Sequence, residues 1–287
     1  MLGDKSMDWK KAKTILILVF FILNTILAVV LYNNLKVEEV SKQIIDNTVE
    51  ILKQNNVRIE CTIPKDTGKD YTLQYEEMVF DKVKKMKIAT ILLGGNYTEV
   101  DNNSYKNGSK SLVFNSDSGF EFLDTGHNNV LKSASKADID KYIKKESEEL
   151  GLPFDEFKLD GYYPPIKPDD DETRVVYKGE FKGHAVFDNY IDIVVSKSAI
   201  KSVKYHYKKP ISITVKDDTY VIPVYEILIT KITKYPGIAI TAVDMGFKGY
   251  TKVDKETKTL FEGLSWRIKT HAGKEYYFNA RNGVEME

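Results

Sequence analysis

The hydrophobic and polar positions divide the chain into one unbroken apolar segment and a long region of short alternating segments. The segment from Thr14 to Tyr32 contains no charged side chain. A helix of this length spans roughly 28 Å at about 1.5 Å per residue, close to the ~30 Å hydrocarbon core of a bilayer. Backbone groups inside lipid must pair within the segment, which an α-helix achieves. The pattern therefore predicts a transmembrane helix over 14–32.

The residues on either side of this segment predict its orientation. Trp9, Lys10, Lys11 and Lys13 precede it, and Tyr32 closes it, followed by Glu38 and Glu39. Positive flanks stay in the cytoplasm, and Trp and Tyr settle at the two interfaces. We therefore expect a cytoplasmic tail over 1–13 and an extracellular remainder, a single-pass protein of the cell membrane.

A cleaved signal peptide is the alternative interpretation of the apolar segment. The segment is longer than the roughly 7–15 apolar residues of a signal peptide, and no small-x-small cleavage site follows it. We therefore expect an uncleaved anchor.

Beyond the anchor the spacing of apolar residues changes from helical to alternating. Apolar residues recur at helical spacing between Val37 and Leu52, which predicts a juxtamembrane helix over 33–56 that leaves the bilayer directly. Alternation then predicts a strand over Val57–Ile63 and, more weakly, another over Tyr71–Tyr75.

The rest of the chain alternates between predicted helices and groups of short strands. Helices are predicted over Met78–Gly94, where a strand is the less favoured alternative, over Lys136–Leu150 between an N-cap at Ser135 and a stop at Gly151, and over Val224–Lys234. The predicted strands are Tyr97–Val100, Ser111–Asn115, Phe120–Leu123, Thr173–Phe181, Ala185–Ser196, Ala199–Tyr207, Ile238–Val243, Gly246–Lys252, Leu260–Thr270 and Glu275–Ala280.

This order of elements predicts an α+β fold. Short turns between the strands favour antiparallel pairing, and a helix followed by three or four strands recurs along the chain. We expect exported antiparallel sheets, each packed with a helix, in an N-terminal α+β subdomain over 57–134 and a C-terminal region over 135–287.

Composition narrows the possible functions. Lys plus Arg and Asp plus Glu both number 42, so the formal net charge is zero, which argues against a nucleic-acid-binding surface. Cys61 is the single cysteine, so no internal disulfide can form. It occupies an apolar position of a predicted strand, which favours a small core residue over a reactive thiol.

No catalytic, cofactor-binding or metal-binding pattern emerges from the sequence. The four histidines are isolated and lack metal-ligand spacing, and no nucleophile elbow or phosphate-binding loop is present. The acidic run 169–172 lacks the alternating oxygen ligands of an EF-hand loop, so a solvated loop is favoured over a calcium site. We therefore expect a protein that is not an enzyme.

Asn24 carries the one amide side chain deep in the predicted span. Its amide could hydrogen-bond a neighbouring helix or the carbonyl four residues before it, and the sequence leaves both open. It is the candidate helix contact.

Both ends of the chain resemble the YycI family. The start Met7-Asp8-Trp9-Lys10-Lys11-Ala12-Lys13-Thr14, followed at once by the span, is similar to the start of that family. The segment around Trp266 and Arg267, with the later segment containing Tyr277, Asn279, Ala280 and Gly283, resembles its closing hairpin and the last hairpin of PepSY-type domains.

The resemblance implies a non-catalytic regulator of the WalK/WalR (YycG/YycF) two-component system, which controls cell-wall metabolism genes. The implied partners are the sensor histidine kinase and, as a further candidate, a YycH-like sister protein, contacted through membrane helices and extracellular domains. The alternative from the same resemblance is an exported PepSY-like module that binds a wall-derived ligand or inhibits an exported protease.

Overall fold

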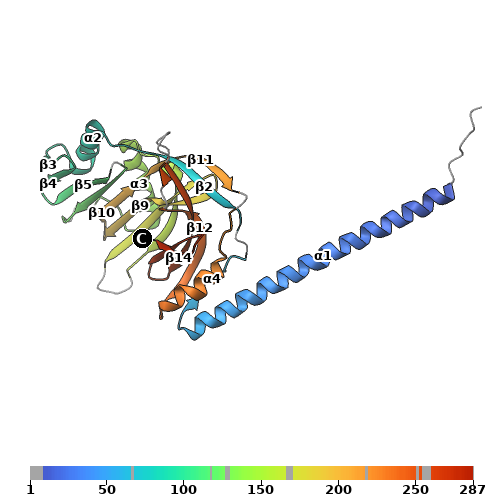
Figure 1. Ribbon diagram of the computed structural model, residues 1–287. Helices are drawn as coiled ribbons and strands as arrows, with labels where there is room; N and C mark the ends of the chain where they lie inside the picture. Colours follow the sequence, from blue (N-terminus) through green and yellow to red (C-terminus); the bar gives the residue numbers. More distant parts are fainter. Residues whose placement is uncertain are drawn as a thin grey trace, which may run out of the picture.

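The computed structural model describes residues 9–65, 68–116, 118–126, 130–165, 171–216, 219–249, 252–253 and 260–286. It consists of one long helix and a mixed α+β domain built around a large sheet (Figure 1). The α+β prediction is thereby confirmed. Of the acidic run, residues 169 and 170 lie outside the described residues, as does His127.

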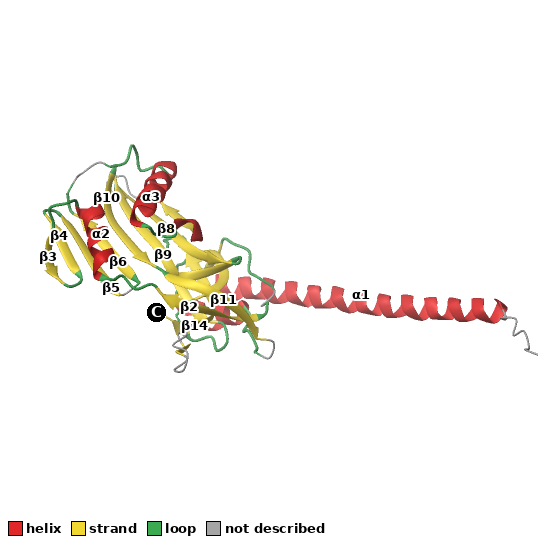
Figure 2. Cartoon of the chain, turned by 90° about the horizontal axis from the view of Figure 1, so that it is seen from above, coloured by secondary structure: helices red, strands yellow, loops and turns green. Residues whose placement is uncertain are grey.

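The first helix, α1 (Trp9–Gln54), runs for 46 residues without a break. It projects from the domain as a single rod, and its C-terminal end lies beside α4 (Val224–Thr230) (Figures 1 and 2). The predicted juxtamembrane helix over 33–56 is therefore the continuation of the apolar helix rather than a separate element.

Two further helices begin and end where local chemistry predicts. The side chain of Asp81 accepts a hydrogen bond from the backbone N–H of Lys84 and begins α2 (Lys82–Leu93), which Gly94 ends. Ser135 caps α3 (Lys136–Leu150) through the N–H of Asp138, and Gly151 ends it in the left-handed conformation at φ 71°. These boundaries confirm a helix in the segment 78–94 and the cap residues of the second predicted helix.

The described residues form sixteen strands that belong to one hydrogen-bonded sheet. They are β1 (Arg58–Ile59), β2 (Asp70–Glu77), β3 (Thr98–Asp101), β4 (Ser104–Asn107), β5 (Lys110–Ser116), β6 (Gly119–Asp124), β7 (Phe157–Tyr163), β8 (Glu172–Phe181), β9 (His184–Ser196), β10 (Ala199–His206), β11 (Lys208–Lys216), β12 (Ala239–Phe247), β13 (Lys252–Val253), β14 (Leu260–Thr270), β15 (Glu275–Asn279) and β16 (Glu285–Met286).

The main path through the sheet is β11-β2-β14-β12-β9-β10-β6-β5-β4-β3. Pairing is antiparallel except where β12 runs parallel to β1 and to the start of β9. β7 and β8 extend from the other side of β9, while β15 and β16 extend from β14. The strand β9 therefore joins two parts of the sheet.

Two hydrophobic cores lie on these two parts. The first core takes its buried residues from between Phe80 and Tyr207, under α2 and α3. The second contains Leu52 of α1, Val224 of α4 and Trp266 of β14. The first core draws on residues before and after position 134, and the division into regions 57–134 and 135–287 stays a prediction.

Several predicted strand boundaries were wrong. The strands predicted over 238–243 and 246–252 are not separated at this point: β12 runs through Gly246 to Phe247, and Lys252 begins the next strand, β13. A Cβ at Gly246 would lie 2.6 Å from the carbonyl oxygen of Ala185, so glycine permits the parallel approach of β9. The strand predicted over 57–63 is reduced to the two residues of β1. Strands β4 and β11 were not predicted.

Candidate functional site

The candidate membrane residues all lie on the free N-terminal part of α1. The stretch Lys11–Val30 is long and apolar enough to cross a membrane, and none of it is buried against the rest of the protein. Trp9, Lys11 and Lys13 are exposed at its start, and the backbones of Lys10 and Tyr32 lie in the same helix. The structure thus supports a single-pass membrane protein.

Asn24 hydrogen-bonds its own helix. Its Nδ2 donates to the carbonyl oxygen of Phe20 at 2.9 Å, four residues earlier, and Thr25 donates in the same way to Phe21. Its other N–H and its Oδ1 have no partner among the residues that the structure describes. This second N–H and Oδ1 could therefore hydrogen-bond a neighbouring helix.

The other end of α1 is fixed in the second core. Leu52 and Thr48 are fully buried, and Ile45 packs at the edge of this core. The helix contacts α4 and β1, and Val57 continues the buried surface directly after it. A displacement of the folded domain is therefore transmitted to the apolar segment through continuous helix.

The residues of the family-like hairpin build the end of the sheet. Trp266 is buried, and its Nε1 donates to the carbonyl oxygen of Ile222 at 2.8 Å. Ala280 is fully buried, and Asn279 Oδ1 accepts from the N–H of Arg281 at 2.9 Å. Gly283 has φ 65°, a left-handed conformation that glycine adopts without strain, and it turns the chain from β15 to β16. Trp266 on β14 pairs with Phe278 on β15, as expected for a hairpin.

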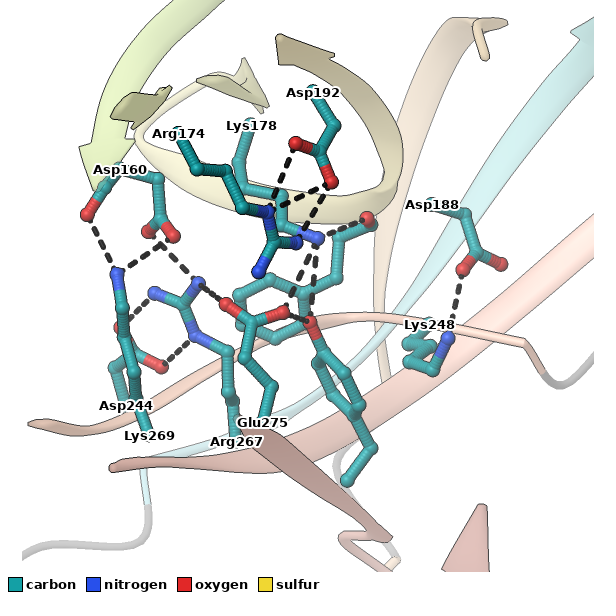
Figure 3. A network of polar contacts seen from close by, with 12 residues as sticks. Asp160, Arg174, Lys178, Asp188, Asp192, Asp244, Lys248, Arg267, Lys269 and Glu275 are labelled. Carbon is teal, nitrogen blue, oxygen red and sulfur yellow. Dashed lines mark hydrogen bonds and ion pairs between the residues drawn. The ribbon is translucent and has the colours of Figure 1, made fainter. Parts of the chain in front are cut away.

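Arg267 lies on the opposite face of β14 from Trp266, and it is also buried. Its guanidinium forms ion pairs with Asp160 at 2.8 Å, Asp244 at 2.6 Å and Glu275 at 3.1 Å (Figure 3). It also lies over the ring of Phe187, 4.6 Å from the ring centre. One arginine thus connects β7, β12, β15 and β9.

Lysine side chains extend this network on both sides. Lys269 Nζ binds Asp160 Oδ2 at 2.9 Å, and Lys178 Nζ lies 3.4 Å from Glu275 and 3.3 Å from the hydroxyl of Tyr277 (Figure 3). Tyr277 in turn donates to Glu275 Oε2 at 2.5 Å. The network holds β7 and β8 against the hairpin of β14 and β15.

A second group of buried charges lies beside the first. Lys208 binds Glu262 at 2.6 Å and Asp188 at 3.4 Å, and Lys248 binds Asp188 at 3.1 Å. Glu262 is fully buried, and its second carboxylate oxygen has no partner among the described residues. This group joins β9, β11 and β14.

The pKa shifts follow from burial opposed by these pairings. Burial alone would raise the pKa of Asp160, but Arg267 and Lys269 outweigh it and hold that pKa below its usual value. Burial lowers the pKa of Lys178, with Glu275 opposing. Burial raises the pKa of Glu262 despite Lys208. The network therefore stabilises the ionised forms of Asp160 and Arg267.

We expect Asp160→Asn to lower the free energy of unfolding by about 2 kcal/mol at neutral pH, because the amide cannot replace a carboxylate beside two cations. The lowered pKa means that Asp160 stabilises the fold above its unfolded pKa of about 3.9, and that this contribution is lost as pH falls through the folded pKa. The stability gap between wild type and variant should shrink below about pH 4, as measured by urea titrations across pH.

Both proteins contain Glu262, so its opposite pH dependence cancels in this comparison. A gap that stays constant from neutral to acidic pH would show that Asp160 contributes through packing and not through its charge.

The network offers no sign of catalysis. Each of its carboxylates is paired with a cation, and within the described residues no group of three or more His, Cys, Asp and Glu is placed to hold a metal ion. Asp171 and Glu172, the described part of the acidic run, lead into β8, where Asp171 lies 3.8 Å from Lys197. The geometry is that of a structural joint between parts of a sheet.

Comparison with known families decides the relationship. A family model described as YycI protein matches residues 35–281, which covers the end of α1 and most of the domain. The chain belongs to the YycI family. Among curated proteins no match was found.

Membership of the YycI family indicates a regulator of the YycG/WalK two-component system. The family is regulatory and non-catalytic, and it is associated with the YycG histidine kinase.

Proposed function

We propose that this YycI protein regulates a WalK/YycG-like sensor histidine kinase, and thereby cell-wall metabolism genes, through contacts of its membrane helix and its extracellular domain. The observation that carries the proposal is the unbroken helix α1, which joins the apolar span to the second core. Family membership supplies the identity of the regulated system.

The proposed orientation places the N-terminus in the cytoplasm and the domain outside the cell. Lys10, Lys11 and Lys13 on the N-terminal side of the span support it through the positive-inside rule. Between Val30 and Ile45, where α1 reaches the second core, the helix extends roughly 21 Å at about 1.5 Å per residue. The helix would therefore hold the domain above the membrane surface, where it could contact the extracellular domain of the kinase.

In this proposal the protein regulates the kinase through physical contacts and not by catalysing a reaction. A sister protein of the YycH kind would be a further partner of the same complex, bound through its own helix and domain. Helix shifts of about 1–2 Å at an interface can switch an assembly between two packed arrangements. In this proposal, α1 is fixed to the domain at one end and packs against kinase helices at the other. It would thereby stabilise one of the two arrangements of the kinase helices over the other.

Deletion of the gene tests this proposal. We expect the phosphorylated fraction of the response regulator to change, and the intact gene supplied in trans to restore it. Asn24→Leu should insert normally and shift the phosphorylated fraction in the same direction as deletion, by less, because an interhelical amide hydrogen bond contributes only about 0.6–2 kcal/mol.

Thr25→Val is the matched control, since the Thr25 hydroxyl already bonds its own helix. A deletion strain with unchanged phosphorylation under every growth condition would end the kinase proposal. It would leave the alternative, an exported PepSY-like ligand-binding or protease-inhibiting module, as the explanation to pursue.

A further inference from the structure

Helices α2 and α3 both cover the sheet over the first core (Figure 2). A cavity lies between them. Its volume is about 520 Å³, within the range of about 300–1,000 Å³ that small-molecule sites occupy. The floor is apolar, with Phe122 of β6 and Ile200 of β10, and Leu92 of α2 and Tyr142 of α3 form its walls.

A smaller cavity of about 40 Å³ lies beneath α3 and shares Leu92, Phe122 and Tyr142 with the first. It is lined by Tyr205, whose side chain is buried and whose hydroxyl has no hydrogen-bond partner among the described residues. An unpaired buried hydroxyl costs about 1–3 kcal/mol. The apolar floor therefore continues inward to the Tyr205 hydroxyl, which could form a hydrogen bond with a ligand.

The cavity also carries an excess of available positive charge. Four of its lining residues are lysines, and of these Lys145 pairs with Glu149 at 3.4 Å. The other three, Lys110, Lys132 and Lys141, form no ion pair with a described residue, although Lys110 Nζ lies 3.4 Å from the carbonyl oxygen of Leu92.

Asp124, Asp138 and Glu146 also line the cavity, so the four lysines exceed the carboxylates by one. Asp124 accepts from Ser109 at 2.7 Å and from the N–H of Gly126 at 2.8 Å, and Asp138 accepts from Ser133 at 2.6 Å. Burial raises the pKa of Glu146, with Glu149 adding to the effect and Lys145 and Lys110 opposing it.

We propose that this cavity binds a small anionic amphiphile, a compound with one phosphate or carboxylate group and a short apolar chain. Lys110, Lys132 and Lys141 hold the anionic group, and the apolar chain lies over Phe122 towards Tyr142. The proposal rests on the cavity alone and not on the proposed regulation of a kinase. It adds a ligand that the extracellular domain could sense.

Isothermal titration of the full chain in phosphatidylcholine nanodiscs tests the proposal, with hexyl phosphate as the probe. We expect saturable binding of one molecule per chain, at least ten-fold tighter than that of inorganic phosphate or hexanol. The double variant Lys132→Gln, Lys141→Gln should weaken hexyl phosphate at least ten-fold. The matched control Lys136→Gln, Lys144→Gln removes two exposed charges of α3 outside the cavity and should bind as the wild type does.

A second series of discs identifies the source of the ligand. If discs rich in phosphatidylglycerol weaken hexyl phosphate binding, a lipid of the protein's own membrane competes for the cavity. Unchanged binding assigns the cavity to a ligand from outside the membrane. Absence of saturable binding, or an equal loss in the two double variants, would overturn the proposal.

Discussion

Replacing Arg267 by Met should lower the free energy of unfolding by about 3–5 kcal/mol, because three carboxylates then lose their shared buried cation. The Arg267 side chain is only 5% exposed, and its partners Asp160 and Glu275 are 12% and 18% exposed. Lys269 and Lys178 remain beside Asp160 and Glu275, but two lysines then face three carboxylates. The unmatched negative charge keeps the cost of desolvation without the attraction that offset it. Urea titration of the full chain in detergent measures the loss.

The fluorescence of Trp266 can report this transition. Trp266 is buried next to Arg267 on β14, and the only other tryptophan is Trp9, at the start of α1. A Trp9→Phe background therefore leaves one probe, inside the second core.

Arg174→Met is the matched control for the Arg267 substitution. Arg174 also forms a two-pronged pair, with Asp192 at 2.7 Å, but its side chain is 45% exposed. Exposed pairs contribute about 0.2–1 kcal/mol, so the control should cost no more than that. Equal losses for the two variants would mean that the buried network is not what holds β7 and β8 to the hairpin.

Local signals were sufficient to predict the elements with strong caps and clear periodicity. Ser135 and Gly151 bound α3 as predicted, and Gly94 ends α2, because capping side chains and glycines with positive φ act within a few residues. The start of α2 was placed too early, at Met78, because Asp81 was not identified as its N-cap. The unbroken apolar run was sufficient for the span. The joining of the two strands predicted in 238–252 depended instead on how closely β9 approaches Gly246, a contact between residues far apart in the sequence.

The buried charges could not be predicted from the alternation along β14. The pattern around Trp266 and Ile268 predicts one buried face, and Arg267 and Lys269 then read as a solvated face. In the structure β7 and β8 cover this second face, so that both faces of β14 are buried. Asp160 and Glu275 lie more than a hundred residues apart, and only the sheet topology brings them to one arginine.

The family-like hairpin residues therefore have a structural explanation. Trp266 anchors to the carbonyl of Ile222, Arg267 holds the charge network, and Gly283 makes the turn to β16. We expect partner contacts to lie elsewhere, on the membrane helix and on the domain surface.

Breaking the rod between the span and the domain should abolish regulation while leaving both parts intact. Inserting Gly-Ser-Gly between Glu39 and Val40 places a flexible joint in the middle of α1. Because glycine disfavours helix by about 1 kcal/mol relative to alanine, the insertion should separate the movement of the domain from that of the span. The phosphorylated fraction of the response regulator should reach the value of the deletion strain.

A helical insertion at the same place is the control. Seven residues of strong helix formers lengthen α1 by about 10.5 Å and return the domain to nearly the same rotational position, because a heptad is close to two turns. We expect this variant to keep most of the regulation, since a stiff connection remains.

The most direct test of the account is to measure the phosphorylated fraction of the response regulator in these two insertion strains, at equal amounts of membrane-inserted protein. The account predicts the deletion value for the flexible insertion and a value near wild type for the helical one. Wild-type phosphorylation with the flexible insertion would contradict it, because regulation would then not depend on continuous helix between membrane and domain.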